Sequence, residues 1–179
     1  MAMRIHSQAG KFNIGNKGFT LIEILIVVMV LGILAMVIIP QITVSTTDAE
    51  ESTLATNITG LRNAIELYYH QHNNVYPGKN SNAGVATVDV AVAATAFVEQ
   101  LTQYTEADGT VANVKSATAK YGPYLKSNTL PVNPFNDLNT VICDTTEDAI
   151  DVKASSGTAA WKFYTITGIL VANDGAHDT

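Results

Sequence analysis

One acidic side chain lies inside a long apolar segment near the start of the chain. Glu23 is the only charged residue among the 21 residues from 19 to 39. A carboxylate at the centre of a membrane helix costs about 2.5–3.5 kcal/mol on insertion scales, and such a charge usually has a partner. No Lys, Arg or His lies within the segment. The chemistry expected of Glu23 is therefore an ion pair with an amine, supplied by the chain's own N-terminus or by another subunit.

The length of this apolar segment indicates a membrane helix. At about 1.5 Å per residue, its residues extend about 31 Å, close to the thickness of the hydrocarbon core of a bilayer. Basic residues precede the segment, and Asp48, Glu50 and Glu51 follow it. The positive-inside tendency places the N-terminal side in the cytoplasm and the bulk of the chain outside. A secretory signal peptide is the rival interpretation, but its apolar core is normally 7–15 residues long.

The residues around Glu23 form a motif. The run Lys17-Gly18-Phe19-Thr20-Leu21-Ile22-Glu23 resembles the class III signal of type IV pilins and type II secretion pseudopilins. The resemblance implies that a prepilin peptidase cuts between Gly18 and Phe19 and methylates the new N-terminal Phe19. It also implies that Glu23, then the fifth residue of the mature chain, pairs with the N-terminal amine of a neighbouring subunit.

Two residues are expected to weaken the apolar helix. Pro40 removes a backbone hydrogen bond and clashes with the preceding turn, and Gly32 is a second weak point. The family has a glycine and a proline in the same places. We expect one long helix with kinks at Gly32 and Pro40. The alternative is that Pro40 ends the membrane helix and a separate helix begins later.

A narrow apolar stripe predicts that the helix continues beyond the membrane. The stripe residues are spaced four and three apart and need a partner surface: Leu54, Ile58, Leu61, Ile65 and Tyr68. A second short helix is predicted over 94–104, and strands near 140–143, 161–166 and 169–172. We therefore expect an α+β, type IV pilin-like fold, in which the long N-terminal helix packs on a small antiparallel β-sheet.

The chain is thus predicted to have three parts. Residues 1–18 are a leader peptide, 19–40 a transmembrane and filament-core helix, and 41–179 a periplasmic head domain. Loss of the leader removes three positive charges and takes the formal net charge from −6 to −9. Because duplex affinity comes largely from Lys and Arg, no nucleic-acid partner is expected.

The head contains no motif that indicates catalysis. Nucleophile-elbow, P-loop, zinc-protease, CxxC and dinucleotide patterns are absent from the sequence, so no enzyme is predicted. The single cysteine, Cys143, is interpreted as a small buried residue, with an intermolecular disulfide as the alternative. His70 and His72 would point about 200° apart on a helix and are expected at the surface rather than as metal ligands.

Calcium is the one cofactor that the resemblance suggests for this chain. Major pseudopilins hold a calcium ion in the loop after their last strands, and calcium requires six to eight oxygen ligands. Asp174 and Asp178 are the candidate ligands here. The family's tail is longer and more acidic than residues 175–179, so the alternative is a frayed polar tail without a metal.

The predicted function is that of a structural subunit. A pseudopilin of type II secretion is preferred, because residues 121–135 resemble the segment before the sheet in major pseudopilins. Such a subunit would sit in the inner membrane and assemble into a homo-oligomeric filament that pushes folded proteins out of the periplasm. Its expected partners are the prepilin peptidase, the inner-membrane assembly platform and minor pseudopilins. The alternatives are a type IV pilus subunit for adhesion, motility or DNA uptake, and a membrane-anchored periplasmic binding domain.

Overall fold

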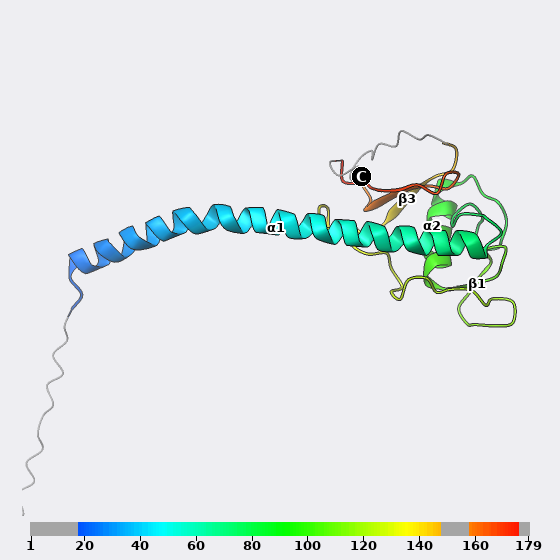
Figure 1. Cartoon of the computed structure of the whole chain (residues 1–179), viewed down its shortest axis with the longest axis horizontal. Coiled ribbons are helices and arrows are strands. Elements are labelled where there is room, and N and C mark those ends of the chain that lie inside the picture. The colour runs from blue at the N-terminus through cyan, green and yellow to red at the C-terminus, as the bar shows by residue number, and fades with distance from the viewer. Residues whose placement is uncertain (1–17, 148–157, 176–179) are drawn as a thin grey trace, which may run out of the picture. The chain divides into compact units, whose positions relative to one another are not determined.

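The computed structural model describes residues 18–147 and 158–175, and leaves out the side chains of 37–45. The predicted leader up to residue 17 and the candidate ligand Asp178 lie outside the described residues. The chain divides into two compact units, Met1–Ser45 and Thr46–Thr179. Helix α1, Leu21–Gln71, contributes residues to both (Figure 1).

Helix α1 is the longest element of the protein. Its backbone is helical without interruption from Leu21 to Gln71. The prediction of one long N-terminal helix is therefore confirmed, and the alternative in which Pro40 ends the helix is wrong. Kinks at Gly32 and Pro40 stay predictions.

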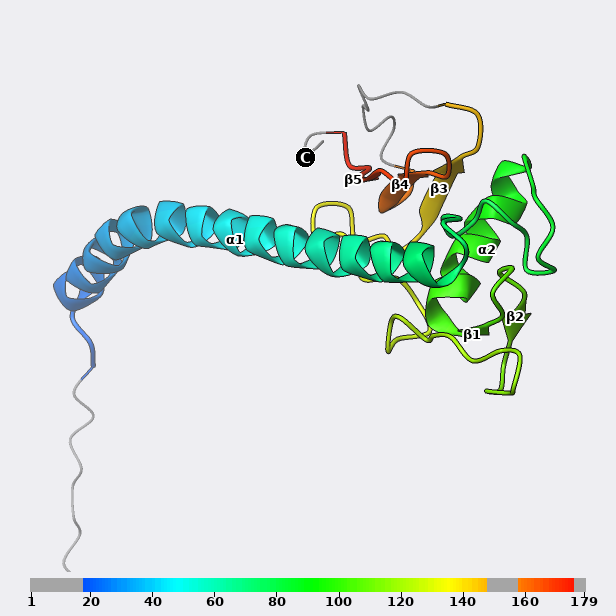
Figure 2. The same cartoon turned by 45° about the vertical axis from the view of Figure 1, so that its right-hand side comes forward.

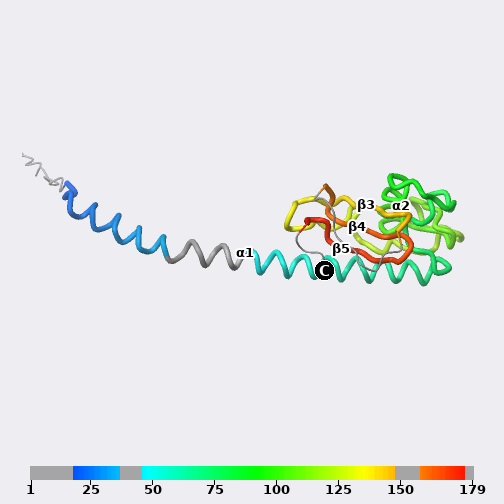
Figure 3. Tube along the Cα trace, turned by 90° about the horizontal axis from the view of Figure 1, so that it is seen from above, coloured from blue at the N-terminus to red at the C-terminus, as the bar shows by residue number. Residues whose placement is uncertain are grey.

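The apolar stripe of α1 forms one side of the core of the head. All five stripe residues are buried, as predicted, and they pack in one cluster with residues of the second helix and of the sheet. Trp161 and Phe163 are the largest contributions from the sheet, and Phe97 the largest from the second helix. Figures 2 and 3 show the strands lying beside the second half of α1.

The three-stranded sheet has the order β3-β4-β5. Its strands are β3, Val141–Asp144; β4, Trp161–Tyr164; and β5, Leu170–Ala172. β4 and β5 are antiparallel, as predicted, but β3 and β4 are parallel, so the prediction of an all-antiparallel sheet is wrong. The reason is the connection: a tight hairpin joins only antiparallel neighbours, whereas residues 145–160 are long enough for the crossover that parallel strands require.

Helix α2, Val90–Thr102, starts four residues earlier than predicted. The carboxylate of Asp89 caps it, accepting hydrogen bonds from the backbone N–H groups of Ala91 and Val92. Tyr104, predicted on this helix, instead begins β1, Tyr104–Thr105, which pairs antiparallel with β2, Val111–Ala112. This short ribbon follows the helix directly.

Candidate functional site

The start of α1 is closed by a reciprocal pair of hydrogen bonds between Thr20 and Glu23. The Glu23 Oε2 atom accepts from the Thr20 backbone N–H at 2.9 Å and from the Thr20 hydroxyl at 2.8 Å. The Glu23 backbone N–H donates in return to the Thr20 hydroxyl oxygen at 3.3 Å. This arrangement is a capping box, which satisfies backbone donors at a helix N-terminus.

The capping box gives Glu23 a local role beside the predicted one. Sequence reasoning missed Thr20, although the spacing of a threonine and a glutamate three residues later before an apolar run is the signal for it. Both hydrogen bonds from Thr20 end on the same carboxylate oxygen, Oε2. The carboxylate is therefore held at the first turn of the helix, next to Phe19, where the predicted cut would create an amine.

The residues on either side of the predicted cut, Gly18 and Phe19, are both exposed to solvent. Phe19 is 83% exposed, and a Cβ atom added to Gly18 would meet no atom within 4 Å. Packing inside the chain therefore gives no reason for a glycine at position 18. A requirement for glycine there has to come from whatever recognises the segment.

The first half of α1 exposes apolar side chains on every side. Between Phe19 and Met36, fourteen large hydrophobic side chains are each at least half exposed. Soluble monomers rarely expose contiguous apolar patches larger than a few hundred Å². This surface therefore requires lipid or other protein chains to cover it. In the described part of the chain, the structure has no helix that meets the length and apolarity needed to cross a membrane.

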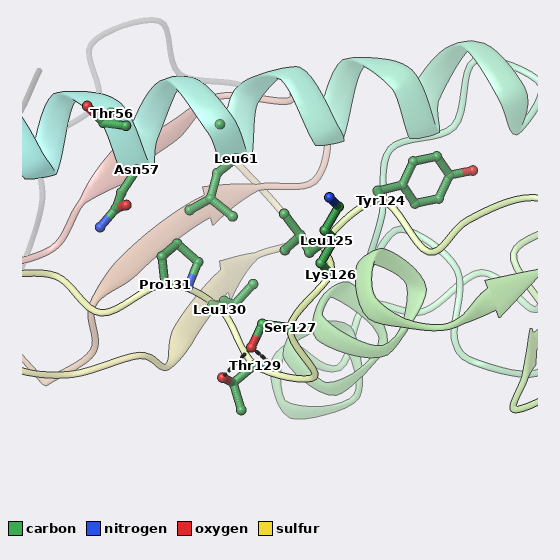
Figure 4. Close-up of a pocket in the computed structure, with 11 residues that line it drawn as sticks. Thr56, Asn57, Leu61, Tyr124, Leu125, Lys126, Ser127, Thr129, Leu130 and Pro131 are labelled. Atoms are coloured by element: carbon green, nitrogen blue, oxygen red, sulfur yellow. Dashed lines mark hydrogen bonds between the residues drawn. The ribbon is translucent and has the colours of Figure 1, made fainter.

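A groove of about 420 Å³ lies in the head between α1 and the chain segment 124–131. In Figure 4, Asn57 and Leu61 project from α1 toward Leu130 and Pro131 on the facing segment. The Asn57 side-chain amide donates to the Val132 carbonyl oxygen at 3.0 Å and ties the two walls together. Sequence reasoning did not predict this groove, because its two walls are more than 60 residues apart in the chain.

His72 is not a surface residue, so that expectation is wrong. It is 1% exposed, at the end of α1, where its ring stacks on Tyr68. Nδ1 donates to the Tyr68 carbonyl oxygen, since a carbonyl can only accept, and Nε2 then accepts from the Thr105 hydroxyl; both distances are 2.8 Å. Burial lowers the pKa of His72. His70 is exposed, so the two histidines do not form a joint site.

Cys143 is buried on β3, as predicted. Burial is the main cause that raises the pKa of its thiol to about 12, with the nearby Asp144 carboxylate as a smaller one. Because the thiolate is the reactive form, this cysteine is protected from oxidation and exchange at neutral pH. An intermolecular disulfide through Cys143 would require the head to open.

The described residues do not complete a calcium site. Asp174 Oδ2 accepts a hydrogen bond from the Asn133 side-chain amide at 3.1 Å. In the described part of the chain, no group of three or more His, Cys, Asp or Glu residues could hold a metal ion. A single carboxylate is too few for calcium, which takes six to eight oxygen ligands. Calcium binding by Asp174 and Asp178 stays a prediction.

Comparison with known proteins adds to the geometry of the N-terminal segment. The family described as the prokaryotic N-terminal methylation motif matches residues 14–39. The chain carries the type IV prepilin motif. The match covers the predicted cut, the capping box and the exposed apolar half of α1. The roles in cleavage, methylation and assembly that were predicted for Gly18, Phe19 and Glu23 stay predictions.

The chain is similar to two kinds of protein, type IV pilins or fimbrial proteins and a core protein of type II secretion. The chain is 43% identical over 72 residues to a fimbrial protein of Neisseria meningitidis, and 40% identical over 72 residues to a type IV major pilin of Neisseria gonorrhoeae. It is 40% identical over 62 residues to a type II secretion system core protein G of Vibrio cholerae. None of these relatives is named as an enzyme.

The similarity covers only part of each protein. The matched stretches are 40%, 40% and 35% of this chain, and in each case 42% of the relative's length. The chain therefore spans less than half the length of the curated relatives it matches. No solved structure matches the chain significantly.

Proposed function

We propose that this protein is a structural subunit of a type IV pilin-like filament. Residues 1–18 are removed by a prepilin peptidase, residues 19–40 span the inner membrane before assembly, and the head lies in the periplasm. Copies then associate through the Phe19–Ile39 helices. Glu23 pairs with the N-terminal amine of a neighbouring copy, so that the cost of desolvating both charges is offset by their attraction.

The observation that carries this proposal is the exposed apolar surface between Phe19 and Met36, where fourteen large hydrophobic side chains are at least half exposed. A helix that is apolar all round is buried in a membrane or in a large assembly. An anchor alone needs only apolar residues, whereas here a carboxylate is held at the first helical turn by Thr20. A charge retained in such a position is a functional residue by default.

The proposed role of Glu23 is tested by substitution in the full-length chain. Glu23→Ala is expected to leave cleavage intact and to reduce assembled filaments at least tenfold, because the buried amine then has no partner. Thr20→Val is the matched control: it removes the hydroxyl of the capping box but keeps the charge of Glu23, so it should assemble far better than Glu23→Ala. Equal assembly of Glu23→Ala and wild type would contradict the proposal.

Within this class we propose a subunit of a type II secretion pseudopilus. The resemblance of residues 121–135 to major pseudopilins supports this choice, and so does the relative from Vibrio cholerae. In this role the filament works with the assembly platform and minor pseudopilins to push folded proteins outward. Deletion of the gene should then block secretion of a folded periplasmic protein and leave surface pili unchanged.

A type IV pilus subunit is the second candidate, because the Neisseria relatives are at least as similar over a longer stretch. Deletion should then abolish long surface filaments and leave secretion intact. A membrane-tethered periplasmic binding domain is the candidate from another class. That candidate predicts that Glu23→Ala has no effect on the protein's behaviour.

A further inference from the structure

Gly60 is one of the residues that line the groove, and it leaves the backbone of α1 bare there. Glycine in the interior of a helix is less favourable than alanine, so its presence there needs a reason. A Cβ atom added to Gly60 would meet no atom within 4 Å, so nothing inside the subunit requires a glycine. A bare helix surface allows another backbone or side chain to approach closely, and the groove is open to one at this point.

The groove also lies in the basic part of an acidic protein. Lys126 is the only charged residue among those that line it, and it is exposed. Residues 109–136 contain three lysines and no acidic residue, although the chain as a whole has a formal net charge of −6. Among the described residues, Lys126 has no ion-pair partner. An acidic surface would complement this groove.

The turn of α1 from Asp48 to Glu51 provides such a surface on the same molecule. It carries three carboxylates, of which Asp48 and Glu51 are exposed, and none has an ion-pair partner within the described part of the chain. Glu51 precedes Gly60 by nine residues, or two and a half helical turns. It therefore lies on the opposite side of α1, about 14 Å away along the helix axis.

We propose that the groove between α1 and segment 124–131 is a docking site for a second copy of this chain, which places its Asp48–Glu51 turn against Lys126. This inference rests on the proposed function, because it assigns one contact between heads in the filament. Since Glu51 lies on the opposite side of α1 from Gly60, a copy whose Glu51 reaches the groove of one neighbour keeps its own groove free for the next. Such a heterologous contact does not close into a dimer and extends into an open filament.

Cysteine cross-linking tests the proximity of the two surfaces. The full-length chain carrying Glu51→Cys and Lys126→Cys is expressed with a type IV filament assembly machinery, and sheared filaments are treated with a short bis-maleimide. Cross-linked dimers, trimers and longer species are expected. Each single-cysteine variant is expected to give no ladder beyond a dimer, and the buried Cys143 should stay unmodified. A double variant that gives no ladder in intact filaments would overturn the proposal.

Charge reversal tests whether the contact contributes to assembly. Lys126→Glu is expected to reduce sheared filaments at least tenfold, and Glu51→Lys in the same chain should restore them. Lys115→Glu is the matched control, because Lys115 is an exposed lysine of the same basic segment that does not line the groove. Assembly of Lys126→Glu at the level of Lys115→Glu would contradict the proposal.

Filling the groove separates docking from folding. Gly60→Leu is expected to keep the melting temperature of the head at or above that of the wild type, because the added side chain meets open space, and to reduce filaments. Asn63→Leu, at an exposed position of α1 that does not line the groove and is about three turns away from Glu51, is the control and should assemble normally. Normal assembly of Gly60→Leu would overturn the docking site.

The outcomes distinguish this inference from the proposed function. If the wild-type chain forms filaments that Glu23→Ala abolishes, while Lys126→Glu and Gly60→Leu assemble normally, only the docking site is wrong. If the wild-type chain forms no filaments and Glu23→Ala has no effect, both are wrong.

Discussion

The imidazole ring of His72 lies flat on the ring of Tyr68, with centroids 3.7 Å apart and an angle of 3° between the planes. The stack ends the buried stripe of α1 and connects it to β1 through the hydrogen bond that His72 Nε2 accepts from the Thr105 hydroxyl. The rings of Tyr121 and Tyr124 surround the same imidazole at 5.3 and 6.1 Å. His72 thus fastens the end of α1 to two segments from later in the chain.

The burial of His72 predicts that the head loses stability in mild acid. Desolvation lowers the pKa of His72 and outweighs the opposing effects of the Tyr68 and Glu106 carbonyls and of the Asp108 carboxylate. The unfolded chain therefore binds a proton at His72 more readily than the folded head does. The free energy of unfolding should fall as the pH drops below about 6.5 and level off below the pKa of the folded state.

Denaturant unfolding at pH 7.5 and pH 5 measures this effect. A pKa difference of one unit between the two states corresponds to about 1.4 kcal/mol. His72→Gln keeps a polar side chain and removes the titration, so its loss between the two pH values should be smaller than that of the wild type. His70→Gln, at an exposed position, is the control and should lose as much as the wild type. An equal loss in His72→Gln would show that another group is responsible.

Cleavage at residue 18 is expected to fail in the variant Gly18→Val. A side chain at this position has open space in the chain itself, so a defect would reflect recognition by the peptidase rather than misfolding. Most of the protein should then keep its leader, as measured by the mass of the intact membrane-extracted chain. Gly15→Val, three residues earlier in the leader, should be processed normally. Normal removal of residues 1–18 from Gly18→Val would count against the leader assignment.

Gly168 has a steric role that the comparable Gly175 does not have. Both glycines have a positive φ, 74° and 81°, but a Cβ at Gly168 would overlap the Tyr76 ring, whereas one at Gly175 would meet nothing within 4 Å. Gly175→Ala should therefore cost only the left-handed backbone strain, about 1–2 kcal/mol. Gly168→Ala should cost a further 1–3 kcal/mol, the usual range for overpacking. Urea unfolding of the two variants measures the difference, and equal costs would show that the Tyr76 ring moves aside freely.

Calcium binding at the C-terminal loop is tested by thermal unfolding. If Asp174 and Asp178 hold the ion, calcium at one hundred times its dissociation constant should stabilise the head by about 2.7 kcal/mol relative to a chelator. Asp174→Asn should remove this gain, and magnesium should not reproduce it. A melting temperature that calcium does not change would favour the polar tail without a metal.

The sequence was sufficient to predict the long helix and to predict which side of that helix is buried. Leu54, Ile58, Leu61 and Ile65 repeat at the helical period, and all of them lie in the core. Periodicity records which side of a helix is apolar, so it predicts burial well wherever one side packs and the other does not. The predicted ends of the strands and the predicted start of α2 were less accurate. The start of α2 depends on its cap, Asp89.

Features that depend on distant segments could not be predicted in the same way. The parallel pairing of β3 with β4 has no local signal in the residues of either strand. His72 directly follows Gln71, the last residue of α1, where a polar side chain usually faces water, and its burial depends on Thr105 and Tyr124. The groove beside Gly60 likewise exists only once segment 124–131 has packed on α1.

The order of the strands in the sheet affects how the head folds. β4 is the central strand, and Trp161 follows Tyr68 at the end of the stripe on α1 by about 90 residues. Contacts between such distant parts of a chain form slowly, because a large loop must close before they contribute. During synthesis the stripe of α1 therefore lacks its partners Trp161 and Phe163 until β4 has been made, although Phe97 of α2 is present earlier. Apolar surface that stays exposed in this interval favours aggregation.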